Sequence, residues 1–442
     1  MRNLTIKAGL AGLTLLAAAC TEPEAILPGE RLNIRAGLQG GEVEVDPENT
    51  VRAVSLPGVR ANANWPQSPV SPAFRTDNAA LSSGSLRPLW SVSIGQGDKR
   101  RVRLNTDPIA DGGRIYTMDS AHLVTALSTS GQVLWTHDLT PLRDDNSQAQ
   151  GGGLSSGGGR IYAASGFGTV TALDPATGQE IWTQRVDNTA TGAPTFYDGV
   201  VYVTSGDSIG WAIEADSGRV RWQISGVGDV NNVAGAPAPA VNDTRVIFSF
   251  GDGTLQSAFR QGGLRLWNAD VAGTRPGFTI AKIDDITGDP LIDGDTVYVG
   301  NYSGRVVAFD VGNGERRWTA RDGALNPVWP GGDSVYFVSD RNQLIRLDAT
   351  DGSRIWAVNL PGYEPSRKPQ TRRDSFYAQH GPILANGRLI VAGSDGFLRA
   401  FDPTNGALVG TTPIDGGATT RPIVAGGVLY VVSSKGQLHA FR

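Results

Sequence analysis

The 442-residue sequence contains very few residues of several types. It has one cysteine, two methionines and four histidines, and charged residues make up 19% of it. Because the single cysteine is Cys20, no disulfide can form within the chain and packing alone must stabilise the fold. The histidines, His122, His137, His380 and His439, show no spacing typical of a metal site. The net charge of −4 argues against nucleic acid as a main partner, because phosphate binding requires a concentrated basic surface.

Long apolar runs are also missing, apart from one near the N-terminus. Residues 8–19 follow two basic residues and are apolar or small, but they are too few for a bilayer-spanning helix of about 20 residues. Their proportions are those of a signal peptide. Leu16-Ala17-Ala18-Ala19-Cys20 resembles the lipobox of bacterial lipoproteins, with the leucine one position early. The resemblance implies removal of residues 1–19, acylation of Cys20 with fatty acids such as palmitate, and an outer-membrane location on the periplasmic face. The alternative is an incidental cysteine in the apolar part of a signal.

Residues 20–84 have the composition of an acylated N-terminus and a mostly extended tether. They are rich in Pro, Ser, Asn and Ala and show little sustained periodicity, which favours extended chain and turns over a packed core. Trp65, in the stretch NWPQ, is the exception. We expect it to dock onto the folded body, because an exposed tryptophan in a linker is hard to justify.

Glycine, in contrast, is abundant, with 58 residues, and it recurs within a repeated pattern. The stretch RIYAASGFGTVTALDPATGQEIW at 160–182 contains strand-like apolar runs separated by Gly and Asp turns. Most copies of this unit are followed by Gly-x-x-x-Trp, but Gly410 replaces the tryptophan after the seventh. The eight copies begin at residues 114, 160, 200, 245, 296, 334, 388 and 428, a period of roughly 40–50 residues.

Each copy supplies four strand-length runs, and such a unit can bury both of its faces only against neighbouring copies. A tryptophan strand at 86–94 precedes the first copy, whereas no such strand follows the last copy. We therefore predict an all-β fold for residues 85–442. The expected architecture is an eight-bladed β-propeller of four-stranded antiparallel blades, closed by the N-terminal strand, which completes the C-terminal blade.

The repeat pattern VYVGxxxGxVxALDxxTGxxxW resembles the quinoprotein-type propeller repeat over essentially all of residues 85–442. That family divides into periplasmic dehydrogenases that use pyrroloquinoline quinone (PQQ) and the non-enzymatic outer-membrane assembly factor BamB. BamB is a lipoprotein of the machinery that folds β-barrels into the outer membrane. The dehydrogenase branch implies a vicinal cysteine pair, a Trp floor beneath the cofactor and a Ca²⁺ site with an Asp base. Here the only cysteine lies in the signal region, so the cysteine pair is absent.

The polar residues of the repeats do not suggest a catalytic, cofactor or metal site. Asp174, Asp310, Asp348 and Asp402 recur at one turn position, where we expect them to accept backbone N–H bonds. The stretch GLSSG at 153–157 matches a nucleophile pattern, but we expect a glycine-rich turn before a strand there instead of a strand-to-helix elbow. We predict a non-enzymatic, BamB-like scaffold without a cofactor. The alternatives are a periplasmic PQQ-dependent dehydrogenase or a degenerate relative, and a wall-binding or secretion lipoprotein.

The resemblance to BamB implies partner-binding loops around the middle blades. In BamB, a Leu-x-Leu-Arg stretch and an acidic pair contact BamA, the barrel-forming subunit, and the corresponding loops here are 226–239 and 278–290. Asp284 and Asp285, with Lys282 beside them, resemble the acidic stretch and would accept charge-assisted bonds from a partner. The alternative is a solvated turn. The first stretch differs, since the apolar anchor and the arginine are replaced by Asp229, Val230, Asn231 and Asn232.

Two basic loops, 99–103 and 366–373, are further candidates for partner contacts. The second contains Arg372 and Arg373, which would bind acidic protein surface or lipid headgroups unless the loop is simply solvated. The expected partners are a BamA-like subunit and other members of the Bam complex. Nascent outer-membrane β-barrel proteins would join them through strand addition to blade edges or loops, and the membrane would join through the lipid anchor.

Overall fold

The computed structural model describes residues 47–69, 71–81, 84–99, 102–206, 208–228, 236–271, 273, 286–365 and 375–442. The chain forms two compact units, one of residues 44–361 with 378–442 and one of residues 1–43 with 362–377. In the second unit, the described residues include an antiparallel bridge between Tyr363 and Phe376, whose rings meet edge-on at a centroid distance of 4.8 Å. Among the described residues there is no helix that could span a membrane.

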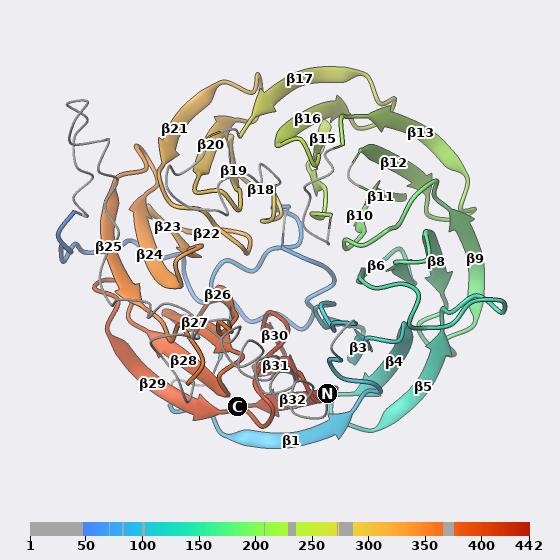
Figure 1. Ribbon diagram of the computed structural model, residues 1–442, viewed down its shortest axis with the longest axis horizontal. Coiled ribbons are helices and arrows are strands. Elements are labelled where there is room, and N and C mark those ends of the chain that lie inside the picture. The colour runs from blue at the N-terminus through green and yellow to red at the C-terminus, as the bar shows by residue number, and fades with distance from the viewer. Residues whose placement is uncertain are drawn as a thin grey trace, which may run out of the picture. The chain divides into compact units, whose positions relative to one another are not determined.

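The larger unit is an eight-bladed β-propeller of four-stranded antiparallel blades, as the repeat predicts (Figure 1). From the innermost strand outward, the first four blades are β2 (Ile109–Asp111), β3 (Arg114–Met118), β4 (Leu123–Ser128) and β5 (Val133–Asp138); β6 (Gly152–Gly157), β7 (Arg160–Ser165), β8 (Thr169–Leu173) and β9 (Glu180–Arg185); β10 (Thr195–Tyr197), β11 (Val200–Ser205), β12 (Ile209–Glu214) and β13 (Val220–Ser225); and β14 (Ala240–Val241), β15 (Arg245–Ser249), β16 (Thr254–Phe259) and β17 (Arg265–Asp270). The other four are β18 (Leu291–Asp293), β19 (Thr296–Gly300), β20 (Val306–Asp310) and β21 (Arg316–Ala320); β22 (Trp329–Gly331), β23 (Ser334–Val338), β24 (Gln343–Asp348) and β25 (Arg354–Asn359); β26 (Gln379–Ala385), β27 (Arg388–Gly393), β28 (Phe397–Phe401) and β29 (Leu408–Pro413); and β30 (Ile423–Ala425), β31 (Val428–Ser433), β32 (Gln437–Phe441) and β1 (Pro88–Ser93).

The ring closes by pairing two distant parts of the chain. β1 pairs antiparallel with β32 and so becomes the outer strand of blade 8. Beyond the strand ends, the backbones of Arg87 and Arg442 exchange two hydrogen bonds of 2.8 and 2.9 Å. The predicted closure by the N-terminal strand is therefore confirmed, and it removes the free edges that an open array of sheets would expose.

The repeated tryptophan fastens each blade to the next one. Trp135 of blade 1 packs on the turn of blade 2, where its indole Nε1 donates to the carbonyl of Pro175 at 3.0 Å. Asp174 accepts backbone N–H bonds at the start of that turn, as predicted. A Cβ atom on Gly178 would lie 2.4 Å from the Trp135 ring, and the φ of Gly178 is +72°, so only glycine fits there. The same indole-to-carbonyl bond to the next blade is made by Trp90, Trp182, Trp222, Trp267, Trp318 and Trp356.

Blade 7 lacks this tryptophan because blade 8 has no turn to receive it. β32 and β1 are not consecutive in the chain, so no Asp-x-x-x-Gly turn connects them. Gly410 occupies the tryptophan position of blade 7, and the Thr412 hydroxyl of the same strand donates to the Leu86 carbonyl at 3.1 Å. The exception in the repeat thus follows from the way in which the ring is closed.

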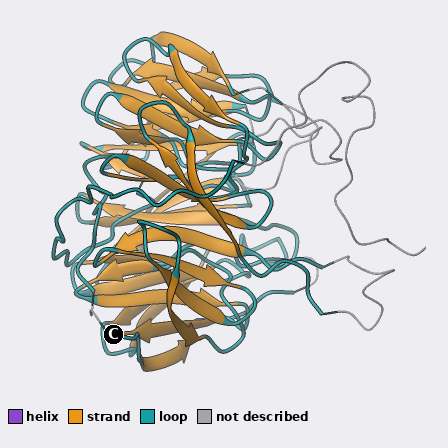
Figure 2. Cartoon of the chain, turned by 90° about the vertical axis from the view of Figure 1, so that its left-hand side faces the viewer, coloured by secondary structure: helices purple, strands orange, loops and turns teal. Residues whose placement is uncertain are grey.

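Figure 2 shows that the propeller consists of strands joined by short loops. Within a blade, the tryptophan also packs on a tyrosine of the second strand. The ring centroids lie 5.8 to 6.1 Å apart in the pairs Trp90–Tyr430, Trp135–Tyr116, Trp182–Tyr162, Trp222–Tyr202, Trp318–Tyr298 and Trp356–Tyr336. Burial raises the pKa of Tyr162, Tyr202, Tyr298 and Tyr336 to about 12, as expected for phenols enclosed by neighbouring blades.

Candidate functional site

The described residues of 60–79 form a belt that follows the inner strands around the propeller axis. Figure 1 shows this segment as the blue trace in the middle of the ring. Its composition shows no periodicity because successive residues contact different blades. In chain order, it contacts blade 8 through Asn62, blade 1 through Trp65, blade 2 through Pro66, blade 3 through Gln67, blade 4 through Ser71, blade 5 through Arg75, blade 6 through Asp77 and blade 7 through Ala79.

Trp65 is the main apolar contact of the belt. Its backbone exchanges two hydrogen bonds with Ala110 of β2, at 2.6 and 2.9 Å. Its ring stacks on Trp329 of β22, with centroids 6.1 Å apart and an interplanar angle of 16°. Only 4% of Trp65 is exposed. The tryptophan thus joins blade 1 to blade 6 across the axis.

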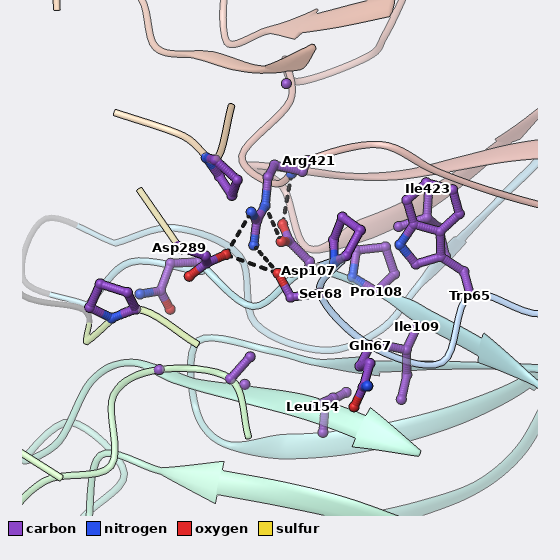
Figure 3. A pocket seen from close by; sticks show the side chains of 18 of the residues that line it. Trp65, Gln67, Ser68, Asp107, Pro108, Ile109, Leu154, Asp289, Arg421 and Ile423 are labelled. Atoms are coloured by element: carbon purple, nitrogen blue, oxygen red, sulfur yellow. Dashed lines mark hydrogen bonds and ion pairs between the residues drawn. The ribbon is translucent and has the colours of Figure 1, made fainter. Parts of the chain in front are cut away.

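Three charged residues meet beside the belt (Figure 3). The guanidinium of Arg421 donates to Asp107 through Nε at 2.5 Å and to Asp289 through Nη1 at 2.9 Å. Ser68 of the belt accepts from Arg421 Nη2 at 3.1 Å and donates to Asp289 at 2.9 Å. Blades 1, 5 and 8 are therefore joined to the belt by one charge-assisted network.

The electrostatics of this network follow from burial and charge pairing. Burial lowers the pKa of Arg421, but attraction to Asp107 and Asp289 outweighs it, so the net shift is upward. Burial raises the pKa of Asp107 against the opposing attraction of Arg421. Burial, together with the positive charge of Arg421, lowers the pKa of His380 to about 4. The arginine is thus held charged, and its hydrogen bonds go to residues of the same network.

The space left on the axis is small. It amounts to about 150 Å³ and is lined by the charged network, by Trp65 and Trp329, and by proline and glycine residues of several blades. Ligand pockets usually begin at about 300 Å³. Among the described residues, no group of three or more His, Cys, Asp or Glu could hold a metal ion. The axial space therefore does not fit a quinone cofactor, and its residues connect blades to the belt.

Comparison with known proteins identifies the family. The family described as "Outer membrane protein assembly factor BamB" matches residues 120–358 and 364–442. The chain belongs to the BamB family. The outer membrane protein assembly factor BamB of Yersinia pestis is 24% identical over 359 residues, covering 80% of this chain and 88% of the relative.

Solved structures agree on the fold. The crystal structure of BamB from Moraxella catarrhalis matches with a TM-score of 0.66 at 17% identity, covering 81% of this chain and 99% of that chain. A europium-containing methanol dehydrogenase also matches, with a TM-score of 0.61 at 14% identity, covering 86% of this chain and 98% of that one. At such identities the likeness concerns the fold alone. Membership of the BamB family decides the class, and the chain is a non-enzymatic member.

The site residues predicted from the sequence all lie outside the described residues. They are Cys20, Asp229, Val230, Asn231, Asn232, Lys282, Asp284, Asp285, Arg372 and Arg373. The first described residues after the two predicted partner-binding stretches are Ala236 and Ile286, and both contact the propeller. The Ala236 N–H donates to the Thr191 hydroxyl at 3.0 Å, and Ile286 is fully buried and bridged to Asn301. Ala236 and Thr287 both line the axial cavity.

The predicted docking of Trp65 onto the folded body is confirmed. Sequence reasoning missed the rest of the belt and the charged network, although one signal for the network was present. In most repeats a proline precedes the first strand, and the residue before it faces the axis. In three blades that residue is charged, in the dipeptides Asp107-Pro108, Asp289-Pro290 and Arg421-Pro422. Because the repeat places equivalent residues around one axis, opposite charges at this position would have predicted an axial ion-pair network.

Proposed function

We propose that the protein is a scaffold lipoprotein of the machinery that assembles β-barrel proteins in the outer membrane. The observation that carries the proposal is the family match, which covers residues 120–358 and 364–442. Curated relatives such as that of Yersinia pestis are named outer membrane protein assembly factor. A propeller whose blades are joined by tryptophans, a belt and an ion-pair network is a rigid support for binding loops.

The proposed partner is the barrel-forming subunit, a BamA-like protein, within a Bam complex. Asp284 and Asp285, with Lys282 beside them, would accept charge-assisted hydrogen bonds from Arg or Lys of that subunit. The stretch of Asp229, Val230, Asn231 and Asn232 would supply polar contacts, since it lacks the apolar anchor and the arginine of the BamB pattern. The order of the sequence supports this assignment of the two stretches, because they precede the inner strands of adjacent blades, β14 and β18.

The proposed location is the periplasmic face of the outer membrane, held by fatty acids on Cys20. Several acyl chains bury enough CH₂ groups for a stable anchor, at about 0.8 kcal/mol for each group. Arg372 and Arg373 would add contacts to acidic protein surface or to lipid headgroups. Nascent barrel proteins are the proposed clients.

Co-purification from solubilised outer membranes tests the partner and its site together. The native chain is expected to bring down the barrel-forming subunit, and Asp284→Ala/Asp285→Ala is expected to lose most of it. Asp144→Ala/Asp145→Ala is the matched control, because it removes an exposed acidic pair from the loop between β5 and β6. Equal recovery with all three proteins would remove the site assignment. Absence of the subunit from the native sample would remove the proposed function.

A further inference from the structure

Every outer strand of the propeller carries a β-bulge at the same position. One extra residue stands there between two residues that pair with the neighbouring strand. A bulge interrupts the ladder and is one way in which proteins keep sheet edges from pairing freely. From blade 1 to blade 8, the bulge residues are Leu134, Ile181, Arg221, Leu266, Arg317, Ile355, Val409 and Leu89.

The edge of blade 6 is already covered, and the covering segment belongs to the same chain. The backbone N–H of Thr50 donates to the carbonyl of the bulge residue Ile355 at 2.8 Å. The side-chain amide of Asn49 takes the place of a peptide group: it donates to the carbonyl of Ala357 and accepts from its N–H, both at 2.9 Å. Arg354 adds a bond to the Pro47 carbonyl at 3.0 Å. The edge of a blade can therefore bind an extended segment despite the bulge.

Covering the edge changes the exposure of the bulge residue. Ile355 is only 4% exposed, whereas the apolar bulge residues of five other blades are 41 to 53% exposed. Blades 3 and 5 differ, since Arg221 and Arg317 stand there. Arg317 is held by Asp295 at 2.9 Å and by Asp310 at 2.7 Å on its own blade. A charged bulge is a recognised protection of a sheet edge. Within the part of the chain that the structure describes, one edge is thus occupied, two edges are charged and five are apolar and open.

Among the open edges, that of blade 7 has the most exposed bulge. Leu408 and Val409 are consecutive and are 54% and 53% exposed. Gly410 follows in place of tryptophan, so no indole anchors this strand to blade 8. The positions of Ile355 and Ala357, which bind the N-terminal segment in blade 6, correspond to Val409 and Thr411 in blade 7.

We propose that the outer edge of blade 7 binds an extended segment of another polypeptide, in the way that blade 6 binds residues 47–50. Backbone groups of the segment bond to the edge at Val409 and Thr411, and its apolar side chains cover Leu408 and Val409. The fitting partner is a strand that has not yet found its sheet, with apolar and polar side chains in alternation. Its identity as a strand of an unfolded barrel protein rests on the proposed function.

Site-specific photo-crosslinking in the full-length, detergent-purified protein tests the proposal. A photoreactive residue is placed at position 411 or, as the control edge, at the equivalent position 319 of blade 5, which leaves Arg317 in place. The probe is a biotinylated peptide of roughly ten residues, a strand length, with alternating valine and threonine. A second probe differs only in a central proline, which removes a backbone donor and prevents edge pairing. We expect crosslinking at 411 with the first probe only, and little at 319 with either probe.

Binding measurements on variants give an independent result. Val409→Arg copies what blades 3 and 5 already carry, so the variant is expected to fold, and it should weaken peptide binding about fivefold. Arg317→Leu should strengthen binding by opening the edge of blade 5. Equal crosslinking at both positions, equal binding of the proline probe, or unchanged binding by Val409→Arg would overturn the proposal.

The barrel-forming subunit separates this inference from the proposed function. Val409→Arg is expected to co-purify with that subunit as the native chain does. If Val409→Arg lost both the recovery of the subunit and the binding of the peptide, the edge would serve the subunit and not a client segment. That result would overturn the assignment. Conversely, peptide binding at blade 7 in a protein that recovers no subunit would keep the edge site and remove only the proposed function.

Discussion

The guanidinium of Arg346 donates a hydrogen bond of 2.7 Å to the backbone carbonyl of Arg52, 294 positions earlier in the chain. A second bond reaches the Ala53 carbonyl at 3.1 Å, and others reach Ser334 of the same blade and Thr404 of blade 7. The side chain is fully buried. In the other blades the equivalent residue beside the outer strand is alanine or serine, namely Ala126, Ala172, Ala212, Ser257, Ala308, Ala400 and Ala440. Arg346 is thus the one departure from the repeat that holds the N-terminal segment on blade 6.

Arg346→Ala restores the residue that most repeats carry, yet we expect it to destabilise the protein. The change removes several charge-assisted bonds and leaves the part-buried carbonyls of residues 52, 53 and 404 without their donor. The expected loss in the free energy of unfolding is about 2–4 kcal/mol, measured by urea denaturation. Arg219→Ala, at an exposed turn position, is the control and should change stability by less than about 0.5 kcal/mol. Equal effects of the two substitutions would contradict the role of Arg346.

Two glycines of the repeat should respond to alanine in opposite directions. A Cβ on Gly352, whose φ is +73°, would lie 2.5 Å from the Trp318 ring, so Gly352→Ala should cost about 2–4 kcal/mol. A Cβ on Gly410 would meet only the Ala400 Cβ, at an ordinary 3.6 Å. Because alanine also restricts the unfolded chain, Gly410→Ala should stabilise by about 0.4–1 kcal/mol. Thermal or urea unfolding of both variants measures the difference, and a destabilised Gly410→Ala would contradict this account of blade 7.

The propeller itself was predictable because its repeat unit occurs eight times in the sequence. The repeat predicts the blades, the Asp turns and the closure by β1, since periodic patterns report the packing of equivalent positions. From the sequence alone, Gly410 is an unexplained exception to the repeat. The closure of the ring explains it, because the tryptophan of a blade packs on a turn of the next blade and blade 8 has no such turn. The sequence of one repeat does not show which of its residues are determined by the adjacent blade.

The belt and the edge of blade 6 were beyond the reach of pattern reasoning. Asn49 and Ser68 contact different blades, so they follow no period of their own, and apart from Trp65 the composition alone suggested a tether. Arg346 was visible as a departure from alanine, but a buried arginine can be assigned a partner only when the fold shows which carbonyls it meets. The partner-site residues, such as Asp284, remain predictions from resemblance.

Acidification should weaken the protein through His380. Its pKa is lowered to about 4 in the folded protein, by burial and by the charge of Arg421, from an ordinary value of 6.5. Between these pH values the unfolded chain binds a proton that the folded chain does not bind, so the free energy of unfolding falls as pH drops from about 6.5 to about 4. The contribution of this one group is about 3 kcal/mol.

His380→Gln removes that contribution, and the test is the pH dependence of urea denaturation from pH 7 to 4.5. The variant should lose less stability than the native protein over this interval. Carboxylates elsewhere titrate in both proteins, so the comparison isolates His380. His137→Gln, on the outer strand β5, is the control for the loss of a histidine at another site. Parallel curves for His380→Gln and the native protein would contradict the assignment.

The stack of Trp65 on Trp329 should be measurable as a coupling between the belt and blade 6. Trp65→Ala is expected to cost about 3–5 kcal/mol, because it empties a buried site at the axis. The two rings lie 6.1 Å apart, so a double-mutant cycle with Trp329→Ala should return an interaction energy of about 0.5–1.5 kcal/mol. Trypsin offers a second readout: cleavage after Arg60 should accelerate in Trp65→Ala if the belt opens locally. Additive losses and an unchanged cleavage rate would mean that the ring fills space without holding the belt to blade 6.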